Sequence, residues 1–224
     1  YSTFLQRSFD QLMQDVAMLG LHVVFAIDRA GLVGEDGETH HGVFDVGFLR
    51  QIPGMRVLAP ATTDELRQML AWAVEKCHGP VAIRYPRGGD RGDLRCSADG
   101  PVVTHRSGEK VAFISYGTVT ENAMAAADIL SQQGIEAAVL RLRALNPLPV
   151  DVLSHMLEGY RHGIIVEEAC AGSGVAPFMI AGLASVKNLN LHVRDLGPGF
   201  VPHGSMGDLY RHCGLDAQAL AAFA

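Results

Sequence analysis

A glycine-rich segment at residues 28–42 concentrates the side chains best suited to chemistry in this sequence. It follows a short apolar run, His22–Ile27 (HVVFAI), which is typical of a buried strand. Open α/β sheets bind ligands at the carboxyl ends of their strands, where such a loop would lie. Arg29 could hold a phosphate or a carboxylate in a planar fork, and His40, close to Asp36, could act as an oriented general acid or base.

Composition alone leaves other interpretations of this loop open. Glycines and acidic residues are common in solvated surface turns, which is the simpler interpretation. A metal site made of Asp36, His40 and His41 is less favoured, because adjacent histidines point apart and no third ligand has a metal-like spacing. We expect His41 to be exposed and His22 to be a strand residue with its hydrogen bonds satisfied.

The overall composition excludes several classes of protein. Of the 224 residues, 48% are hydrophobic and 19% are charged, which is not the composition of a disordered, collagenous or coiled-coil chain. The net charge of −6 without a basic run disfavours nucleic acid as a partner, and no apolar run is long enough to predict a membrane span. The cysteines form no Cys-x-x-Cys pair, so we expect reduced thiols in a cytoplasmic protein, at positions Cys77, Cys96, Cys170 and Cys213.

The pattern of residues 1–88 predicts part of a parallel α/β domain. The expected elements are a helix over 5–19, strands over 22–27, 55–59 and 81–84, a long loop over 28–47, and a helix that begins at the Thr-x-x-Glu capping box of residues 62–65. A strand, a helix and a strand at this spacing form a parallel crossover. Because the series starts on a helix without a preceding strand, we expect the chain to begin inside a domain.

Residues 89–108 and 109–224 have different patterns. Residues 89–108 predict a linker, with a small strand at Val102-Val103. Residues 109–224 predict a second α/β domain with an open, mostly parallel sheet covered on both faces. Its expected strands are 111–116, 137–142, 163–166 and 191–195, and its expected helices are 120–133, 149–157, 175–186, 206–213 and 217–223.

Two turns in the second domain have a shape that could serve a ligand. Gly172-Ser173-Gly174 follows Glu167-Glu168 and opens a helix, which is the geometry of an anion site at a helix N-terminus. A plain strand-to-helix turn is the simpler interpretation. Residues 197–204 (GPGFVPHG) similarly predict a shaped loop.

Four runs, in this order, resemble one family. They are Tyr1–Arg7 (YSTFLQR), Asp28–Gly31 (DRAG), Asp36–Asp45 (DGxTHxGxFD) and Arg84–Gly88 (RYPRG). Together they closely resemble the 1-deoxy-D-xylulose-5-phosphate synthases of the transketolase superfamily. The resemblance extends over essentially the whole chain, as the C-terminal portion of such an enzyme, and is most specific before residue 89.

The resemblance implies a transferase that depends on thiamine diphosphate and magnesium. Enzymes of this family condense pyruvate with glyceraldehyde 3-phosphate, with loss of carbon dioxide, for isoprenoid, thiamine and pyridoxal synthesis. Residues 1–88 would then be the remainder of a parallel-sheet pyrimidine-binding domain. Residues 109–224 would be a transketolase C-terminal-like domain that supports assembly, here expected as a homodimer.

The resemblance also assigns roles to individual residues. Phe4 would stack on the aminopyrimidine ring of the cofactor, and Arg7 would lie near the cofactor. Asp36 and His40 would face the substrate hydroxyls and the aldehyde oxygen as the catalytic pair. The triose phosphate would be bound by Tyr1, Arg29 and Arg87.

Structural interpretations stand beside these roles. Phe4 could belong to the core, and Arg7 could lie on a solvated helix face. We rank Arg84 below Arg87 as a ligand-binding residue, because Arg84 could be a charge at the end of a strand.

The family's magnesium motif, of Gly-Asp-Gly type, does not occur in this sequence. The family glutamate that protonates the aminopyrimidine ring would precede Tyr1. We therefore expect the magnesium ligands to lie outside this chain, in a missing N-terminal domain or chain, and the chain alone to be inactive. Two alternatives remain: the C-terminal half of a split transketolase-like enzyme, and a non-catalytic interaction module.

Overall fold

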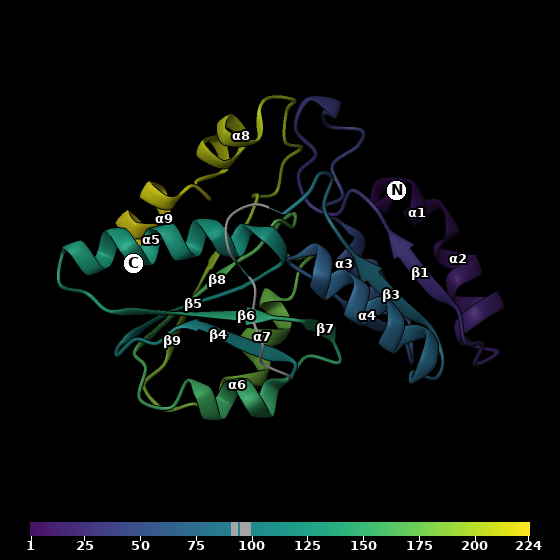
Figure 1. Cartoon of the computed structure of the whole chain (residues 1–224), viewed down its shortest axis with the longest axis horizontal. Coiled ribbons are helices and arrows are strands. Elements are labelled where there is room, and N and C mark those ends of the chain that lie inside the picture. The colour runs from purple at the N-terminus through teal and green to yellow at the C-terminus, as the bar shows by residue number, and fades with distance from the viewer. Residues whose placement is uncertain (91–93, 95–99) are drawn as a thin grey trace.

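Two sheets organise the chain in a computed structural model that describes residues 1–90, 94 and 100–224 (Figure 1). The first sheet has the strand order β1-β3-β2-β7, and the second has the order β4-β6-β5-β8-β9. The strands are β1 (Val24–Ile27), β2 (Arg56–Leu58), β3 (Val81–Arg84), β4 (Val102–Arg106), β5 (Val111–Tyr116), β6 (Ala137–Leu142), β7 (Ala144–Asn146), β8 (His162–Val166) and β9 (Asn190–Arg194).

The α-helices of the described residues flank these sheets. They are α1 (Ser2–Leu5), α2 (Phe9–Gln11), α3 (Asp45–Arg50), α4 (Thr63–Glu75), α5 (Thr120–Gln132), α6 (Val150–Met156), α7 (Ala176–Gly182), α8 (Met206–Cys213) and α9 (Ala217–Phe223). The 3₁₀ turns are η1 (Gln6–Ser8), η3 (Gly34–Asp36) and η4 (Gly117–Val119), and η2 (Leu12–Ala17) is a π-helical segment. None of the helices in the described part of the chain is long and apolar enough to cross a membrane.

The first sheet contains the parallel crossover that the sequence predicts. Strands β1 and β2 both pair in parallel with β3, which lies between them. The helix α4 begins where the capping box predicts, because the Thr62 hydroxyl accepts a hydrogen bond from the Glu65 amide. A fourth strand, β7, comes from the second half of the chain and pairs antiparallel with β2. This strand was not predicted.

Two expectations for the first half need correction. The expected helix over residues 5–19 is a series of short α, 3₁₀ and π turns between Ser2 and Ala17. The expected loop over 28–47 ends early, because α3 starts at Asp45 and buries Val46 and Leu49. These two apolar residues, three positions apart, form a helical stripe too short to stand out in the sequence.

The second sheet confirms the predicted parallel arrangement. Strands β6, β5, β8 and β9 are parallel neighbours in that order. The antiparallel strand β4 is longer than the pair expected at Val102-Val103 and joins the sheet at β6, inside the stretch expected as a linker. The other linker positions at 91–93 and 95–99, which include Cys96, lie outside the described residues.

The second sheet is covered on both faces. Phe113 and Ile164 pack with α5, α8 and α9 on one face, while Ile114 and Ile165 pack with α6 and α7 on the other (Figure 1). The cluster under α6 and α7 also contains Val57 and other buried residues of the first half. The two halves therefore share one hydrophobic core, which fixes the loops of one half against those of the other.

Candidate active site

Three separate segments meet at the carboxyl ends of β1 and β3. Because Ile27 of β1 is paired with Arg84 of β3, the loops that follow the two strands lie side by side. The Ala30 amide donates a hydrogen bond of 3.0 Å to the Tyr85 carbonyl between these loops. The Ser2 amide donates one of 2.8 Å to the Asp28 carbonyl, which brings the first residues of the chain to the same place.

Glycines shape the loop after β1 where there is no room for a side chain. Gly31 and Gly42 exchange two backbone hydrogen bonds of 2.8 Å, which close the loop at its base. A Cβ atom on Gly42 would collide with the Arg29 carbonyl oxygen, and one on Gly31 would lie 2.9 Å from the Glu168 carboxylate. Gly31 also has a φ angle of +82°, which favours glycine.

Aromatic rings form one side of this site. The rings of Tyr1 and Phe4 stack with centroids 5.4 Å apart, and His40 meets Phe4 edge-on at 5.3 Å. The Arg29 guanidinium lies 3.9 Å from the centroid of the Tyr1 ring. Phe4 keeps 44% of its surface exposed, so the alternative interpretation of Phe4 as a core residue is wrong. An exposed, supported ring of this kind can receive another flat ring.

A group of paired charges forms the other side. Arg87 lies 2.9 Å from the Asp36 carboxylate, and the Nε atom of Arg29 lies 3.6 Å from the same oxygen. Arg29 is also held by Asp28 at 2.7 Å. The Arg29 Nε atom is buried and has no hydrogen-bond acceptor among the residues that the structure describes. Two guanidinium groups thus share one carboxylate, and one of them has a donor in reserve.

The structure separates two residues that the sequence suggested as partners. His40 was expected near Asp36, but its Nδ1 atom lies 2.9 Å from the Thr39 hydroxyl, while Asp36 pairs with the two arginines. Asp36 therefore does not orient His40. Arg7 is exposed, and no recorded contact among the described residues joins it to this cluster.

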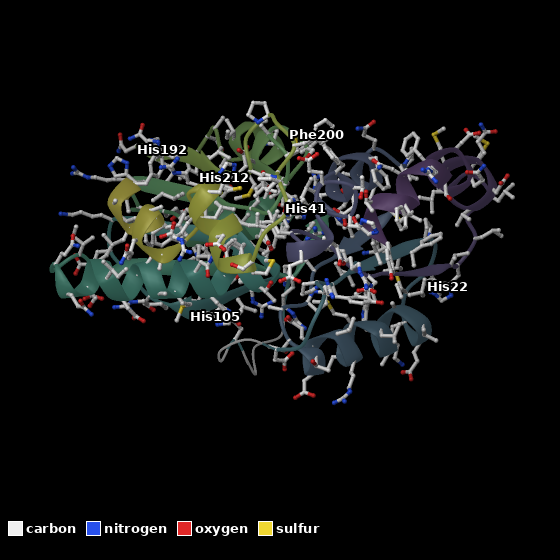
Figure 2. All side chains as sticks on the ribbon, turned by 90° about the horizontal axis from the view of Figure 1, so that it is seen from above. His22, His41, His105, His192, Phe200 and His212 are labelled. Carbon is white, nitrogen blue, oxygen red and sulfur yellow. The ribbon has the colours of Figure 1, made fainter. Side chains whose placement is uncertain are left out.

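His41 is buried, with 3% of its surface exposed, and the expectation that it is exposed is wrong. Its Nδ1 atom accepts a hydrogen bond from the Val33 amide, so the ring carries its proton on Nε2, which lies 3.1 Å from the Pro202 carbonyl oxygen. Figure 2 shows His41 near the middle of the molecule and His22 far from it at the edge of the first half. His22 lies before β1 rather than in it and bonds the Ala73 carbonyl.

A hollow of about 390 Å³ lies beside the paired charges. Arg87 lines it together with residues 32–35 of the loop after β1 and residues 204–206 of the second half. The predicted loop over residues 197–204 therefore contributes to the site, both through this hollow and through the Pro202 carbonyl that His41 contacts.

Comparison with known families identifies both halves of the chain. Residues 1–90 match the model of the transketolase pyrimidine binding domain, and residues 100–220 match that of the transketolase C-terminal domain. The chain belongs to the transketolase family. This combination of domains agrees with the predicted fold class of two α/β domains with mostly parallel sheets.

Individual relatives narrow the resemblance to the synthases. The chain is 42% identical over 230 residues to the 1-deoxy-D-xylulose-5-phosphate synthase of Chlorobaculum tepidum. This match covers 99% of this chain and 36% of the relative. The synthase of Thermomicrobium roseum is also 42% identical, with the same coverage. The chain thus spans about a third of the length of these relatives.

A solved structure with a similar fold is described as a split gene transketolase in the form of an inactive beta4 tetramer. It has a TM-score of 0.85 and 22% sequence identity to this chain, and the match covers 99% of this chain and 72% of that one. At this level of identity the similarity concerns the fold.

A transketolase pyrimidine binding domain relates the chain to enzymes that use thiamine diphosphate. The open ring of Phe4 and the unused Arg29 donor fit the flat and anionic groups that such a site must hold. No group of three potential metal ligands occurs among the described residues.

In the transketolase C-terminal domain, the turn after β8 is a structural turn. The Glu167 carboxylate accepts hydrogen bonds from the amides of Val175 and Ala176, so it occupies the position that an external anion would take at this helix N-terminus. Burial raises the pKa of Glu167, and Asp195 adds to the increase. The simpler interpretation of this turn is therefore the correct one.

Sequence reasoning missed two sets of contacts that hold the site in shape, those of Glu168 and the pair of Arg84 with Asp45. Glu168 accepts hydrogen bonds from the Leu32 amide and the Tyr210 hydroxyl, and so ties the loop after β1 to the second half. Arg84 is buried and pairs with Asp45 at 2.9 Å, which gives it a structural contact; its ranking below Arg87 as a ligand-binding residue stays a prediction. The adjacent Asp45 in the DGxTHxGxFD run was the available signal for this pair.

Proposed function

We propose that this chain forms the pyrimidine-binding and acceptor-binding part of a 1-deoxy-D-xylulose-5-phosphate synthase. A further domain or chain would bind the diphosphate and magnesium, and the whole enzyme would be a cytoplasmic homodimer. The observation that carries the proposal is the meeting of an exposed aromatic ring, Phe4, with two arginines, Arg29 and Arg87, around one carboxylate. The identity to synthases over 99% of the chain supports it.

Thiamine diphosphate, when bound, supplies the electron sink for decarboxylation of pyruvate and for formation of the new carbon–carbon bond. Phe4 would support the aminopyrimidine ring, since its ring stays exposed while Tyr1 and His40 hold it in place. Arg7 is exposed and would complete the cofactor contacts only once the rest of the enzyme is present.

The paired charges suit a phosphate that arrives with the acceptor aldehyde. A phosphate can bind two guanidinium groups at once, and it carries more charge than the carboxylate that they share in the free chain. Arg87 and the unused Nε donor of Arg29 would bind the phosphate of glyceraldehyde 3-phosphate, with Tyr1 beside them. Asp36 would then be released to accept hydrogen bonds from the substrate hydroxyls.

His40 would give its proton to the aldehyde oxygen as the new bond forms. The Thr39 hydroxyl lies at Nδ1, which leaves Nε2 for the substrate. This differs from the pairing with Asp36 that the sequence suggested, because the hydroxyl and not the carboxylate would orient the ring.

The test is the substitution Arg87→Ala in the complete enzyme. We expect the KM for glyceraldehyde 3-phosphate to rise roughly 10- to 150-fold, because a hydrogen bond between charged groups contributes about 1.5–3 kcal/mol. The KM for pyruvate should change much less. Arg67→Ala is the matched control, since Arg67 is an exposed arginine of α4 that pairs with Asp64 outside the site.

Equal losses for both substrates would remove the phosphate assignment. A mixing experiment addresses the wider proposal: adding a chain that carries the Gly-Asp-Gly motif to this chain should restore synthase activity. If no activity appears although both chains are folded and associated, the non-catalytic interaction module is favoured. Restored transketolase activity without synthase activity would favour the split transketolase-like enzyme.

A further inference from the structure

A cavity of about 620 Å³ lies on the first sheet, between α4 and the strands β2 and β7. It shares no residue with the candidate active site. Arg56 and Leu58 of β2 and Ala144 of β7 form its floor, and Met69 and Trp72 of α4 form one wall. A volume of this size is typical of pockets for small organic molecules.

The wall from α4 offers an aromatic surface. Trp72 is 40% exposed, although it is the largest side chain of the helix, and the neighbouring Met69 is buried. Leu58 lies between the two sides and is half-buried. A flat apolar group placed against Trp72 would cover surface that the chain itself leaves open to water.

The charged side chains among the described lining residues of the cavity are positive. Arg56 and Arg143 line it, and the described residues of its lining include no aspartate or glutamate. Glu65 lies behind the lining, but its single carboxylate is shared by Arg143 at 2.7 Å and by the buried Arg141 at 2.7 Å. Glu65 is therefore engaged by two arginines and does not pair with Arg56 in any recorded contact.

Arg56 is the cation best placed to bind a ligand. Its guanidinium lies 6.0 Å from the centroid of the Trp72 ring, and no ion pair of Arg56 is recorded among the described residues. Arg143, in contrast, is held by Glu65 and by the Gly100 carbonyl. A ring that stacks on Trp72 would bring an attached carboxylate within reach of Arg56.

We propose that this cavity binds a small aromatic carboxylate. The ring would pack against Trp72, Met69 and Leu58, and the carboxylate would pair with Arg56. This inference is independent of the proposed function, because no residue of the cavity takes part in the proposed reaction.

Trp72 makes the test specific, because it is the only tryptophan in the chain. Its fluorescence therefore reports on this cavity alone. The probe is 3-phenylpropionate, and the matched neutral probe is 3-phenylpropanamide, which has nearly the same shape without the charge. We expect a saturable change in Trp72 fluorescence with the acid, with a Kd of about 1 mM or lower, and at least fivefold weaker binding of the amide.

Two variants locate the charge that is responsible. Arg56→Gln should weaken binding of the acid about tenfold and leave binding of the amide unchanged. Arg67→Gln, on the same helix α4 but outside the cavity lining, should change neither. Thermal unfolding of both variants at the wild-type temperature would show that the fold is intact.

Three results would overturn the proposal. The first is quenching that increases linearly with the acid, as it does for free N-acetyltryptophanamide. The second is equal binding of the acid and the amide. The third is unchanged binding of the acid by a folded Arg56→Gln variant.

Discussion

The loops after β1 and β8 occupy equivalent positions at the carboxyl ends of parallel strands, yet they differ in whether their charged side chains are buried or exposed. After β8, Glu167 and Glu168 are buried, and both carboxylates accept hydrogen bonds from backbone amides and tyrosine hydroxyls. After β1, the side chains of Arg29 and Asp36 are partly exposed, and an Arg29 donor lacks an acceptor. The acids after β8 are enclosed by the fold, whereas the charged side chains after β1 stay partly exposed, as the proposed binding of a ligand requires.

The difference arises from what lies over each loop. The acids after β8 are covered by α7 and by the loop after β1, so water cannot solvate them and the protein must supply every donor. The loop after β1 has the second half on one side only, where His41 and Leu32 are buried. Its other side carries the exposed rings of Tyr1 and Phe4. The same position at the end of a parallel strand thus becomes a structural support or the site that we propose, according to what covers it.

The largest effect on stability should come from removing the buried carboxylate of Glu167, which braces the turn after β8. We expect Glu167→Ala to lower the free energy of unfolding by about 3 kcal/mol, because it leaves the Val175 and Ala176 amides and the Tyr116 hydroxyl without their acceptor. Urea denaturation measures the change. Glu158→Ala is the control, since the Glu158 side chain is 72% exposed, and it should change stability by less than about 0.5 kcal/mol. A loss no larger than that of the control would show that the buried carboxylate is not a brace.

A smaller effect is the pH dependence of the free energy of unfolding, whose direction follows from the pKa of Glu167. Burial raises the pKa of Glu167 above its usual value of 4.5, so the folded state binds this proton more tightly than the unfolded state. The contribution of Glu167 to stability therefore falls as pH rises from the ordinary value through the raised pKa, and it recovers as pH falls. Glu167→Gln cannot titrate at this position.

The comparison of wild type with Glu167→Gln isolates this contribution. We expect the stability of wild type relative to the variant to increase as the pH is lowered from 7 toward 4.5. Urea denaturation at several pH values gives the difference. A difference that stays constant, or that changes in the other direction, would contradict a raised pKa at Glu167.

Periodicity and turn residues predicted the regular parts of both sheets. Strands β5 and β6 and helices α8 and α9 have the predicted bounds, because long apolar runs and clear punctuation mark them. Strand β7 was not predicted, because its three residues carry no periodic signal and because its partner, β2, lies far away in the sequence. Helix α3 was not predicted because its six residues bury only two apolar side chains, Val46 and Leu49, too few for a periodic signal.

For the site, the sequence predicted composition but not contacts. The resemblance selected six residues that the structure brings together, whereas spacing wrongly paired His40 with Asp36 across a loop whose path depends on glycines. The burial of His41 and the support from Glu168 come from residues more than 130 positions away in the second half. No local pattern could have predicted them.

The smallest expected effect on stability is at His40, in the open loop. Its recorded side-chain contacts are with the Thr39 hydroxyl and with rings that are themselves exposed, so His40→Ala should change the free energy of unfolding by no more than about 0.5 kcal/mol. The next residue provides a matched control. His41→Ala removes a buried ring that accepts a hydrogen bond from the Val33 amide and contacts the Pro202 carbonyl, and it should lower the free energy of unfolding by about 2 kcal/mol.

In the complete enzyme the order of the two variants should reverse for catalysis, since a positioned general acid contributes roughly 100- to 10,000-fold to the rate of its step. If His40→Ala destabilises the chain as much as His41→Ala does, His40 belongs to the brace and the contrast between the two loops fails at the residue proposed to act on the substrate.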